Sequence, residues 1–257
     1  WDFERRITSI FPYPNAFGLY LGPVIVMAFP MLARSARLDA PWKTWFWLVT
    51  LLLSVWAVIL SQTEAAWFAI PAALVITSLF LPRAKYLAVP LAILLIIVAM
   101  FVPSWRTPIV QKITLQDYSG QVRMSQWQET WSLLEDQPIV GAGLAGYPKM
   151  FVPYHARSEF EIFEYPHNVI LNIWTEMGLL GLAAFLLLAV FVFAAFLRMR
   201  RAPSHSFWFG AVAFAVLLEM TIHGLVDVPY FKNDLSILTW TFLVLFVIAS
   251  KKDRPLV

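Results

Sequence analysis

Residues 123–181 read RMSQWQETWSLLEDQPIVGAGLAGYPKMFVPYHARSEFEIFEYPHNVILNIWTEMGLLG, and the rest of the chain is organised around this stretch. It begins with a helical pattern and passes through a glycine-rich turn and an acidic, aromatic loop. It ends with a His-Asn pair at the start of a long apolar run. Apolar runs of membrane-span length flank it on both sides, so we predict a polar region held at one surface of a membrane.

The composition predicts an integral membrane protein. Of 257 residues, 60% are hydrophobic and 14% are charged, whereas about 25% are charged in a typical soluble domain. Repeated apolar runs near 20 residues favour spanning helices, because a helix of about that length crosses the hydrocarbon core. The chain has no cysteine, which excludes disulfides, a thiol nucleophile and thiolate metal ligands. The net charge of +3 is small, so the expected partner is membrane lipid and no nucleic acid.

The apolar runs predict an all-α polytopic membrane protein with about seven transmembrane helices and one large extracytoplasmic loop. We treat residues 1–257 as one membrane domain, with the large loop at residues 104–166. Because the chain begins at Trp1 and has no signal peptide pattern, we expect it to be the C-terminal part of a longer protein. The predicted spans are Ala16 to Ala33, Trp42 to Leu60, Ala65 to Leu81, Tyr86 to Val102, Val169 to Met199, Phe207 to Val228 and Leu235 to Ala249.

The basic residues set the predicted orientation. Every second loop is basic, as expected of loops on the cytoplasmic side. In the intervening loops, residues 61–64 and 228–234, the only basic residue is Lys232. The amino end and the large loop are therefore predicted to lie outside the cytoplasm. The basic loops and the basic end contain Arg34, Arg37, Lys43, Arg83, Lys85, Arg198, Arg200, Arg201, Lys251, Lys252 and Arg254.

His167 is the strongest candidate for catalysis. It follows Pro166 and precedes Asn168, a preferred N-cap for the helix that we expect to begin at Val169. This places an imidazole at the outer membrane surface, beside the positive end of a helix dipole that favours anions. Histidine, with a reference pKa of about 6.5, can take a proton from a hydroxyl nucleophile near neutral pH. A histidine that only packs or caps is the alternative from position alone.

Polar and small residues of the same predicted span are interpreted as structural. Glu176 lies two turns into the span, where a carboxylate needs a partner, and we expect it to pair with another span. It lies on roughly the opposite face from His167, so the two are not expected to form a dyad. Gly178 and Gly181 are expected to permit close helix packing.

The glycines at Gly141, Gly143 and Gly146 match the pattern GxGxxG. No strand precedes them and the segment is predicted to lie outside the cytoplasm, which excludes a dinucleotide site. We interpret this segment as a tight turn after the predicted helix of residues 123–135.

One stripe of that helix carries Arg123, Trp127 and Trp131 at positions i, i+4 and i+8. The stripe suits a helix at the membrane interface, with its aromatic side chains toward lipid and the arginine near phosphate. A solvated arginine is the alternative. Other cationic side chains on the outer side could bind a diphosphate: Arg6, Arg106, Lys149 and Arg157.

Two further sets of acidic and histidine side chains can each be interpreted as functional or as structural. The run of Glu159, Glu161 and Glu164 could hold a divalent cation or form a solvated edge. The stripe formed by Glu219, His223 and Asp227 in the predicted sixth span could be a proton or ion path, or polar contacts between helices.

Several motifs occur in order along nearly the whole chain. They are Arg6-Ile-Thr-Ser-Ile-Phe, Pro14-Asn15, Arg123-x-x-x-Trp127, Pro138-x-x-Gly141-x-Gly143, His167-Asn168 and Glu176-x-Gly178-x-x-Gly181. With one large outer loop, this arrangement resembles the O-antigen ligase and O-antigen polymerase superfamily of bacterial envelope glycosyltransferases.

The resemblance implies a GT-C-like fold and a metal-independent, cofactor-free transfer of a glycan from an undecaprenyl diphosphate carrier to an acceptor hydroxyl. The reaction would occur on the outer face of the bacterial inner membrane. It implies His167 as the general base and arginines, Arg6 among them, as the clamp on the diphosphate. The expected substrate-binding residues are Arg6, Arg123, Arg157, Asn15 and Asn168. At Glu64 the family pattern has an arginine, and a carboxylate there would repel phosphate unless it pairs with an arginine or is protonated.

We therefore predict a glycosyltransferase of the O-antigen ligase class. Lipid A-core, a growing glycan, a protein hydroxyl and another envelope polymer all remain open as acceptors, so ligase and polymerase are not separated. A secondary transporter or lipid flippase that uses Glu219, His223 and Asp227 is the alternative from another class. A family member without catalytic activity, suggested by Glu64, is the third.

Overall fold

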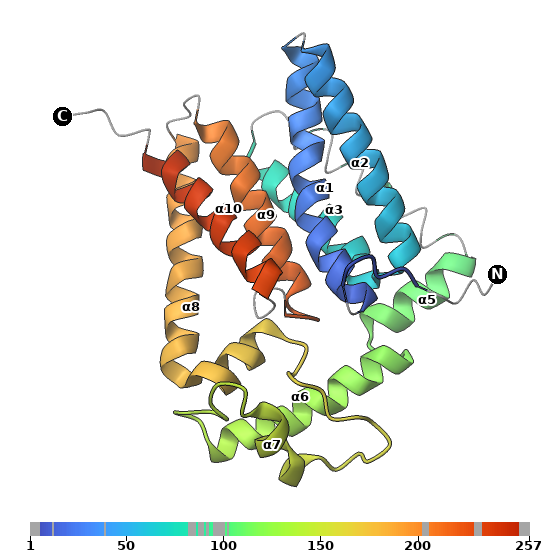
Figure 1. Cartoon of the computed structure of the whole chain (residues 1–257), viewed down its shortest axis with the longest axis vertical. Helices are drawn as coiled ribbons and strands as arrows, with labels where there is room; N and C mark the ends of the chain where they lie inside the picture. Colours follow the sequence, from blue (N-terminus) through green and yellow to red (C-terminus); the bar gives the residue numbers. More distant parts are fainter. Residues whose placement is uncertain are drawn as a thin grey trace. The chain divides into compact units, whose positions relative to one another are not determined.

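In the part of the chain that the structure describes, every regular element is a helix, which confirms the predicted all-α class there (Figure 1). The structure is a computed structural model that describes residues 6–11, 13–38, 40–81, 86, 90, 93–94, 101, 103–201, 206–228 and 233–251. The helices are α1 (Pro14–Arg37), α2 (Pro41–Ser61), α3 (Glu64–Leu79), α5 (Pro103–Ile113), α6 (Tyr118–Asp136), α7 (Tyr147–Phe151), the 3-10 helix η1 (Val152–Tyr154), α8 (Val169–Arg201), α9 (Phe207–His223) and α10 (Asn233–Lys251).

Three of these helices are long and apolar enough to cross a membrane, namely α1, α2 and α8. Shorter apolar helices occupy Glu64–Leu79, Phe207–His223 and Leu235–Lys251. The predicted fourth span, Tyr86 to Val102, falls almost wholly outside the described residues. An integral membrane protein is thus supported, and the count of seven spans stays a prediction.

Local sequence signals explain several helix boundaries. Pro14 and Pro41 stand at the first positions of α1 and α2, where a proline loses no hydrogen bond and its fixed φ already suits a helix. The α2 helix ends at Ser61, and the C-cap residue Gln62 adopts a left-handed conformation with φ 51°. The predicted sixth span is too long at its end, because α9 stops at His223 and residues 224–228 are not helical.

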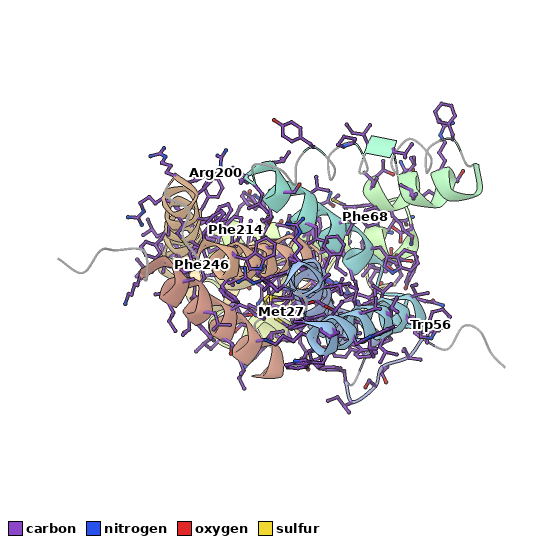
Figure 2. The ribbon with its side chains drawn as sticks, turned by 90° about the horizontal axis from the view of Figure 1, so that it is seen from above. Met27, Trp56, Phe68, Arg200, Phe214 and Phe246 are labelled. Carbon is purple, nitrogen blue, oxygen red and sulfur yellow. The ribbon has the colours of Figure 1, made fainter. Side chains whose placement is uncertain are left out.

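The chain divides into two compact units. The first contains residues 1–89, 192–223 and 229–257. Within it, α1 packs on α2, α3 and α9, and α9 also packs on α3 and α10. Phe214 of α9 stacks on Phe196 with 3.9 Å between ring centroids, and its ring lies 6.4 Å from that of Phe246 on α10 (Figure 2). These aromatic contacts form part of the apolar interior of the first unit, and a second cluster contains Leu21, Ile25, Val58 and Ala66.

The second unit contains residues 90–191 and 224–228. Its core is a cluster of Leu133 and Leu134 from α6 with Tyr147 and Phe151 from α7. The buried hydroxyl of Tyr147 shares a hydrogen bond of 2.7 Å with Thr130 Oγ1. Burial raises the pKa of Tyr147, so its phenol stays neutral and packs as a core residue. The predicted loop of residues 104–166 therefore contains α5, α6, α7 and η1.

Helix α8 is broken at Gly178, where φ is 66° and ψ is −170°. The N–H of Leu179 donates to the carbonyl oxygen of Ile139 at 2.9 Å instead of to Thr175. The carbonyl of Thr175 instead accepts from the N–H groups of Ala142 and Gly143, at 2.7 and 3.0 Å. The glycine-rich turn is thus inserted into the hydrogen-bond ladder of α8.

This arrangement corrects two sequence-based expectations. Among the described residues, the partner of Glu176 is the glycine-rich turn and not another span, because its Oε2 accepts the N–H of Ala145 at 2.6 Å. Gly178 is a break in the helix and not a contact point between helices. The turn itself is as predicted, since Gly141 and Gly143 have φ of 67° and 77°, values that glycine adopts without steric cost.

Candidate active site

His167 pairs with Asp227, and both belong to the second unit. The Nδ1 atom of His167 lies 3.4 Å from Oδ1 of Asp227. Asp227 is 2% exposed and also accepts the N–H of Val228 at 2.8 Å. Because a carboxylate only accepts, the Nδ1 atom carries the hydrogen, which leaves a lone pair on Nε2. Among the described residues, no protein group bonds this Nε2.

Two hydrogen bonds from α6 hold the backbone that precedes His167. The indole N–H of Trp127 donates to the carbonyl of Pro166 at 2.8 Å. The side-chain amide of Gln126 donates to the carbonyl of Tyr165 at 3.1 Å. The indole N–H of Trp127 therefore faces the loop that carries the histidine, and contact of this half-buried side chain with lipid stays a prediction.

Asn168 fixes the backbone that follows, and it confirms the predicted N-cap of α8. Its Oδ1 accepts the N–H groups of Ile170 and Leu171 at 3.0 and 3.2 Å. Its Nδ2 donates to the carbonyl of Leu225 at 3.0 Å. The N–H of Val169 also donates to the carbonyl of Gly224 at 2.6 Å. These bonds tie the start of α8 to the segment that carries Asp227.

Aromatic side chains enclose the imidazole. The rings of Phe163 and Tyr165 lie 4.9 and 4.8 Å from that of His167 between centroids. Burial, and after it the negative charge of Asp227, raises the pKa of Tyr165. The Tyr165 phenol therefore stays protonated at neutral pH, which leaves the imidazole as the group of this cluster suited to accept a proton.

Arg123 lies beside the pair. Its Nε donates to the carbonyl of Val226, next to Asp227 in the chain, at 3.0 Å. Within the described residues, this is the bond that holds its guanidinium, so its two terminal nitrogens remain available for an anion. A base and a cation therefore meet in one unit, a combination suited to a reaction that removes a proton and releases an anion.

Arg6 and Asn15, which the sequence assigns to substrate binding, lie together in the first unit. The guanidinium of Arg6 donates to the carbonyls of Ser61 and Gln62 at 2.8 and 3.1 Å, and to Oδ1 of Asn15 at 2.7 Å. Arg6 thus fastens its segment to the turn between α2 and α3, where Glu64 begins α3. Its binding of a diphosphate stays a prediction.

Arg157 has a carboxylate partner. Its Nε donates to Oε1 of Glu159 at 2.7 Å, and its guanidinium lies 4.6 Å from the ring centroid of Phe160. Its role in substrate binding stays a prediction. In the described residues, no group of three or more histidine and acidic side chains converges as metal ligands do.

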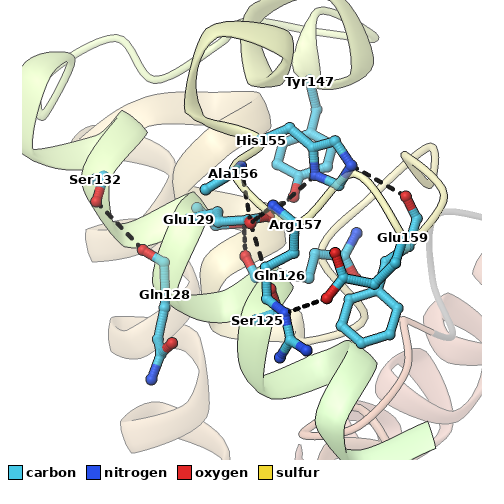
Figure 3. A network of polar contacts seen from close by, with 12 residues as sticks. Ser125, Gln126, Gln128, Glu129, Ser132, Tyr147, His155, Ala156, Arg157 and Glu159 are labelled. Carbon is cyan, nitrogen blue, oxygen red and sulfur yellow. Dashed lines mark hydrogen bonds and ion pairs between the residues drawn. The ribbon is translucent and has the colours of Figure 1, made fainter. Parts of the chain in front are cut away.

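Glu129 organises a second polar network under the loop of residues 155–160 (Figure 3). Its Oε1 accepts the N–H groups of Ala156 and Arg157 at 3.1 and 3.2 Å, and its Oε2 lies 3.2 Å from Nδ1 of His155. The other nitrogen of His155 lies 3.0 Å from the carbonyl of Phe160. One carboxylate of α6 therefore closes this loop, which leads on to His167.

Replacing Glu129 by glutamine is expected to lower the free energy of unfolding by about 2 kcal/mol, because the amide is a weaker acceptor for these donors. Cleavage by trypsin after Arg157 should accelerate. The matched control is Glu135→Gln on the same helix, whose exposed carboxylate accepts the indole N–H of Trp131 one turn away. Equal unfolding temperatures and cleavage rates in the two variants would contradict this role for Glu129.

The predicted stripe of Glu219, His223 and Asp227 on one helix is wrong. Glu219 and His223 do pair inside α9, at 3.2 Å between Oε1 and Nδ1. Asp227 lies beyond the end of α9, where it pairs with His167. The sequence patterns place both His167 and Asp227 at the outer ends of predicted spans. This shared position was the sequence feature from which their pairing could have been predicted.

The fold and this site define a class: an all-helical integral membrane protein with a His-Asp pair and an arginine in a polar region between apolar helices. Residues 49–186, more than half of the chain, match the family model of O-antigen ligase, and the chain belongs to this family. The match confirms the resemblance drawn from the motifs and includes Arg123 and His167. The family indicates a glycan-transferring membrane enzyme with a lipid-linked glycan and an acceptor as partners. A search of curated proteins finds no match.

Proposed function

We infer that this protein transfers a glycan from an undecaprenyl-diphosphate-linked donor to an acceptor hydroxyl on the outer face of the bacterial inner membrane. The observation that carries this proposal is the His167–Asp227 pair. A buried carboxylate that holds one ring nitrogen fixes the tautomer and leaves the other nitrogen as a base. The family supplies the class of reaction, and this pair supplies a group able to perform it.

The chemistry needs one proton acceptor. Nε2 of His167 takes the proton of the acceptor hydroxyl as its oxygen attacks the anomeric carbon of the donor glycan. The new glycosidic bond forms while the bond from that carbon to the diphosphate oxygen breaks, and the carrier leaves as the lipid diphosphate. Asp227 stabilises the imidazolium that results, because its negative charge lies against Nδ1.

The departing diphosphate needs positive charge and hydrogen-bond donors. Arg123 offers the two terminal nitrogens of its guanidinium from a position fixed by Val226. A planar guanidinium matches the oxygens of a phosphate group in a bidentate manner. Arg123 is therefore the arginine of the second unit that we assign to the leaving group.

The direct test is transfer by the purified full-length protein in proteoliposomes, with an undecaprenyl-diphosphate-linked glycan and a mixed pool of acceptors. We expect product with the wild type, and the acceptor that gains the glycan identifies ligase or polymerase activity. A wild type that binds the donor and forms no product with any acceptor would overturn the proposal. Restored transfer in Glu64→Arg would then assign the loss to Glu64.

Replacing Arg123 by glutamine is expected to raise KM for the donor about tenfold to a hundredfold, because a charge-assisted hydrogen bond to the diphosphate is lost. The KM of Arg123→Lys for the donor should lie between those of the wild type and Arg123→Gln, since lysine keeps the charge without the bidentate geometry. The measurement is initial rate against donor concentration. If Arg157→Gln raises the KM for the donor and Arg123→Gln does not, Arg157 is the arginine that binds the leaving diphosphate.

A further inference from the structure

We propose that Trp127 and Gln126 are positioning residues for His167. Their side-chain N–H groups hold the two peptide units before the histidine, so that its imidazole stays on Asp227. The catalytic consequence rests on the proposed function of His167, whereas the structural consequence can be measured without it.

His167 needs such support because its backbone is strained. Its φ is 47°, in the left-handed region that residues with a side chain rarely adopt and that costs about 1–2 kcal/mol. Such a conformation persists only where the surrounding structure holds it in place. On its carboxyl side, Asn168 and Val169 supply hydrogen bonds to Leu225 and Gly224. On its amino side, the neighbour is Pro166, which has no N–H with which to anchor itself.

The two α6 donors supply the missing anchor. Pro166 is buried, and a buried carbonyl needs a hydrogen-bond partner. The indole N–H of Trp127 meets this carbonyl at 2.8 Å, and Gln126 meets the preceding one at 3.1 Å. Two consecutive residues of α6 therefore hold two consecutive peptide units of the loop. We call these two hydrogen bonds, from Gln126 and Trp127, the clamp.

The clamp is rigid because the core of the second unit holds α6. Leu133 and Leu134 of the same helix are 0% and 1% exposed. A donor on such a helix fixes the position of its acceptor more closely than a donor on a loop does. Without the clamp, the Tyr165 and Pro166 peptide units can rotate and relieve the strain at His167. The imidazole then leaves Asp227, and its tautomer is no longer fixed.

The test compares Trp127→Phe and Gln126→Leu with the wild type. Phenylalanine keeps an aromatic ring and removes the N–H. Trp131→Phe is the matched control, because Trp131 lies one turn further on α6 and its N–H donates at 2.8 Å to Glu135 of the same helix. Asp227→Asn is the reference for a lost partner of His167.

The first readout is 15N NMR of histidine-labelled protein, which distinguishes the Nδ1–H from the Nε2–H tautomer. The chain has four histidines, and the signal of His167 is the one that disappears in His167→Gln. We expect the Nδ1–H form in the wild type and in Trp131→Phe. In Trp127→Phe, Gln126→Leu and Asp227→Asn, we expect a mixture with the Nε2–H form.

The second readout is the steady-state rate. Trp127→Phe is expected to lower kcat about tenfold and to leave KM for the donor within about twofold. An unchanged tautomer in folded Trp127→Phe overturns the inference, whether or not the rate falls. If Trp127→Phe does not fold, the same criterion applies to Gln126→Leu. A shifted tautomer in a protein whose wild type transfers no glycan supports the positioning role and refutes the proposed function.

Discussion

Replacing His167 by glutamine is expected to lower kcat for glycan transfer by about 10²–10⁴-fold, the usual contribution of a general base. Glutamine has a similar reach and can still donate to Asp227, but it does not accept a proton near neutral pH. Donor binding should be nearly unchanged, because the arginine assigned to the diphosphate is intact. The measurements are the single-turnover rate and the binding of the lipid-linked donor in proteoliposomes.

The outcome separates the three functions considered for the chain. A folded His167→Gln protein with wild-type transfer would exclude the histidine as the base. A transporter that uses the α9 pair should instead lose its activity in Glu219→Gln and keep it in His167→Gln. A wild type with no transfer at all would favour a family member without catalytic activity.

Replacing Gly178 by alanine is expected to lower the free energy of unfolding by about 3 kcal/mol or more. The φ of 66° and ψ of −170° lie in a region that only glycine occupies readily. A Cβ at this position would also collide with the carbonyl oxygen of Ile139, the acceptor of the Leu179 N–H. The turn would then be displaced from α8. Thermal unfolding in detergent measures the effect.

Gly143 supplies the matched control for this substitution. It has a positive φ of 77°, and a Cβ there would meet no atom within 4 Å. Gly143→Ala therefore carries only the conformational cost of about 1–2 kcal/mol. Equal losses of stability in the two variants would contradict the added cost that we assign to the collision with Ile139.

The sequence predicts the helices well where the physical signal is local. Asn168 places the start of α8 as predicted. The helices α1 and α2 begin at Pro14 and Pro41, two residues and one residue before the predicted starts at Ala16 and Trp42. Hydrophobic runs identify α1, α2 and α8 as long apolar helices. Each of these signals depends on residues within a few positions of the boundary, so no knowledge of the tertiary structure is needed.

The partners of the polar side chains were not predictable in the same way. The periodicity of the sixth span continues through Asp227, yet the chain leaves the helix after His223 and turns toward His167. Glu176 bonds the N–H of Ala145, an acceptor-donor pair separated by 31 residues. Arg123 bonds a carbonyl 103 residues away. Such contacts follow from loop closure, which no local pattern encodes.

The break at Gly178 also bears on how deep each part of α8 lies in the bilayer. An unbroken helix of 33 residues is about 50 Å long, well beyond a hydrocarbon thickness of about 30 Å. Residues 179–201 alone span about 34 Å, which matches that thickness. Backbone that leaves the helical hydrogen-bond ladder occurs at membrane depth only where protein or a water-filled cavity covers it, so we expect the hydrocarbon region to begin after Gly178. This would place Glu176 at the level of the lipid headgroups, where a carboxylate has access to water.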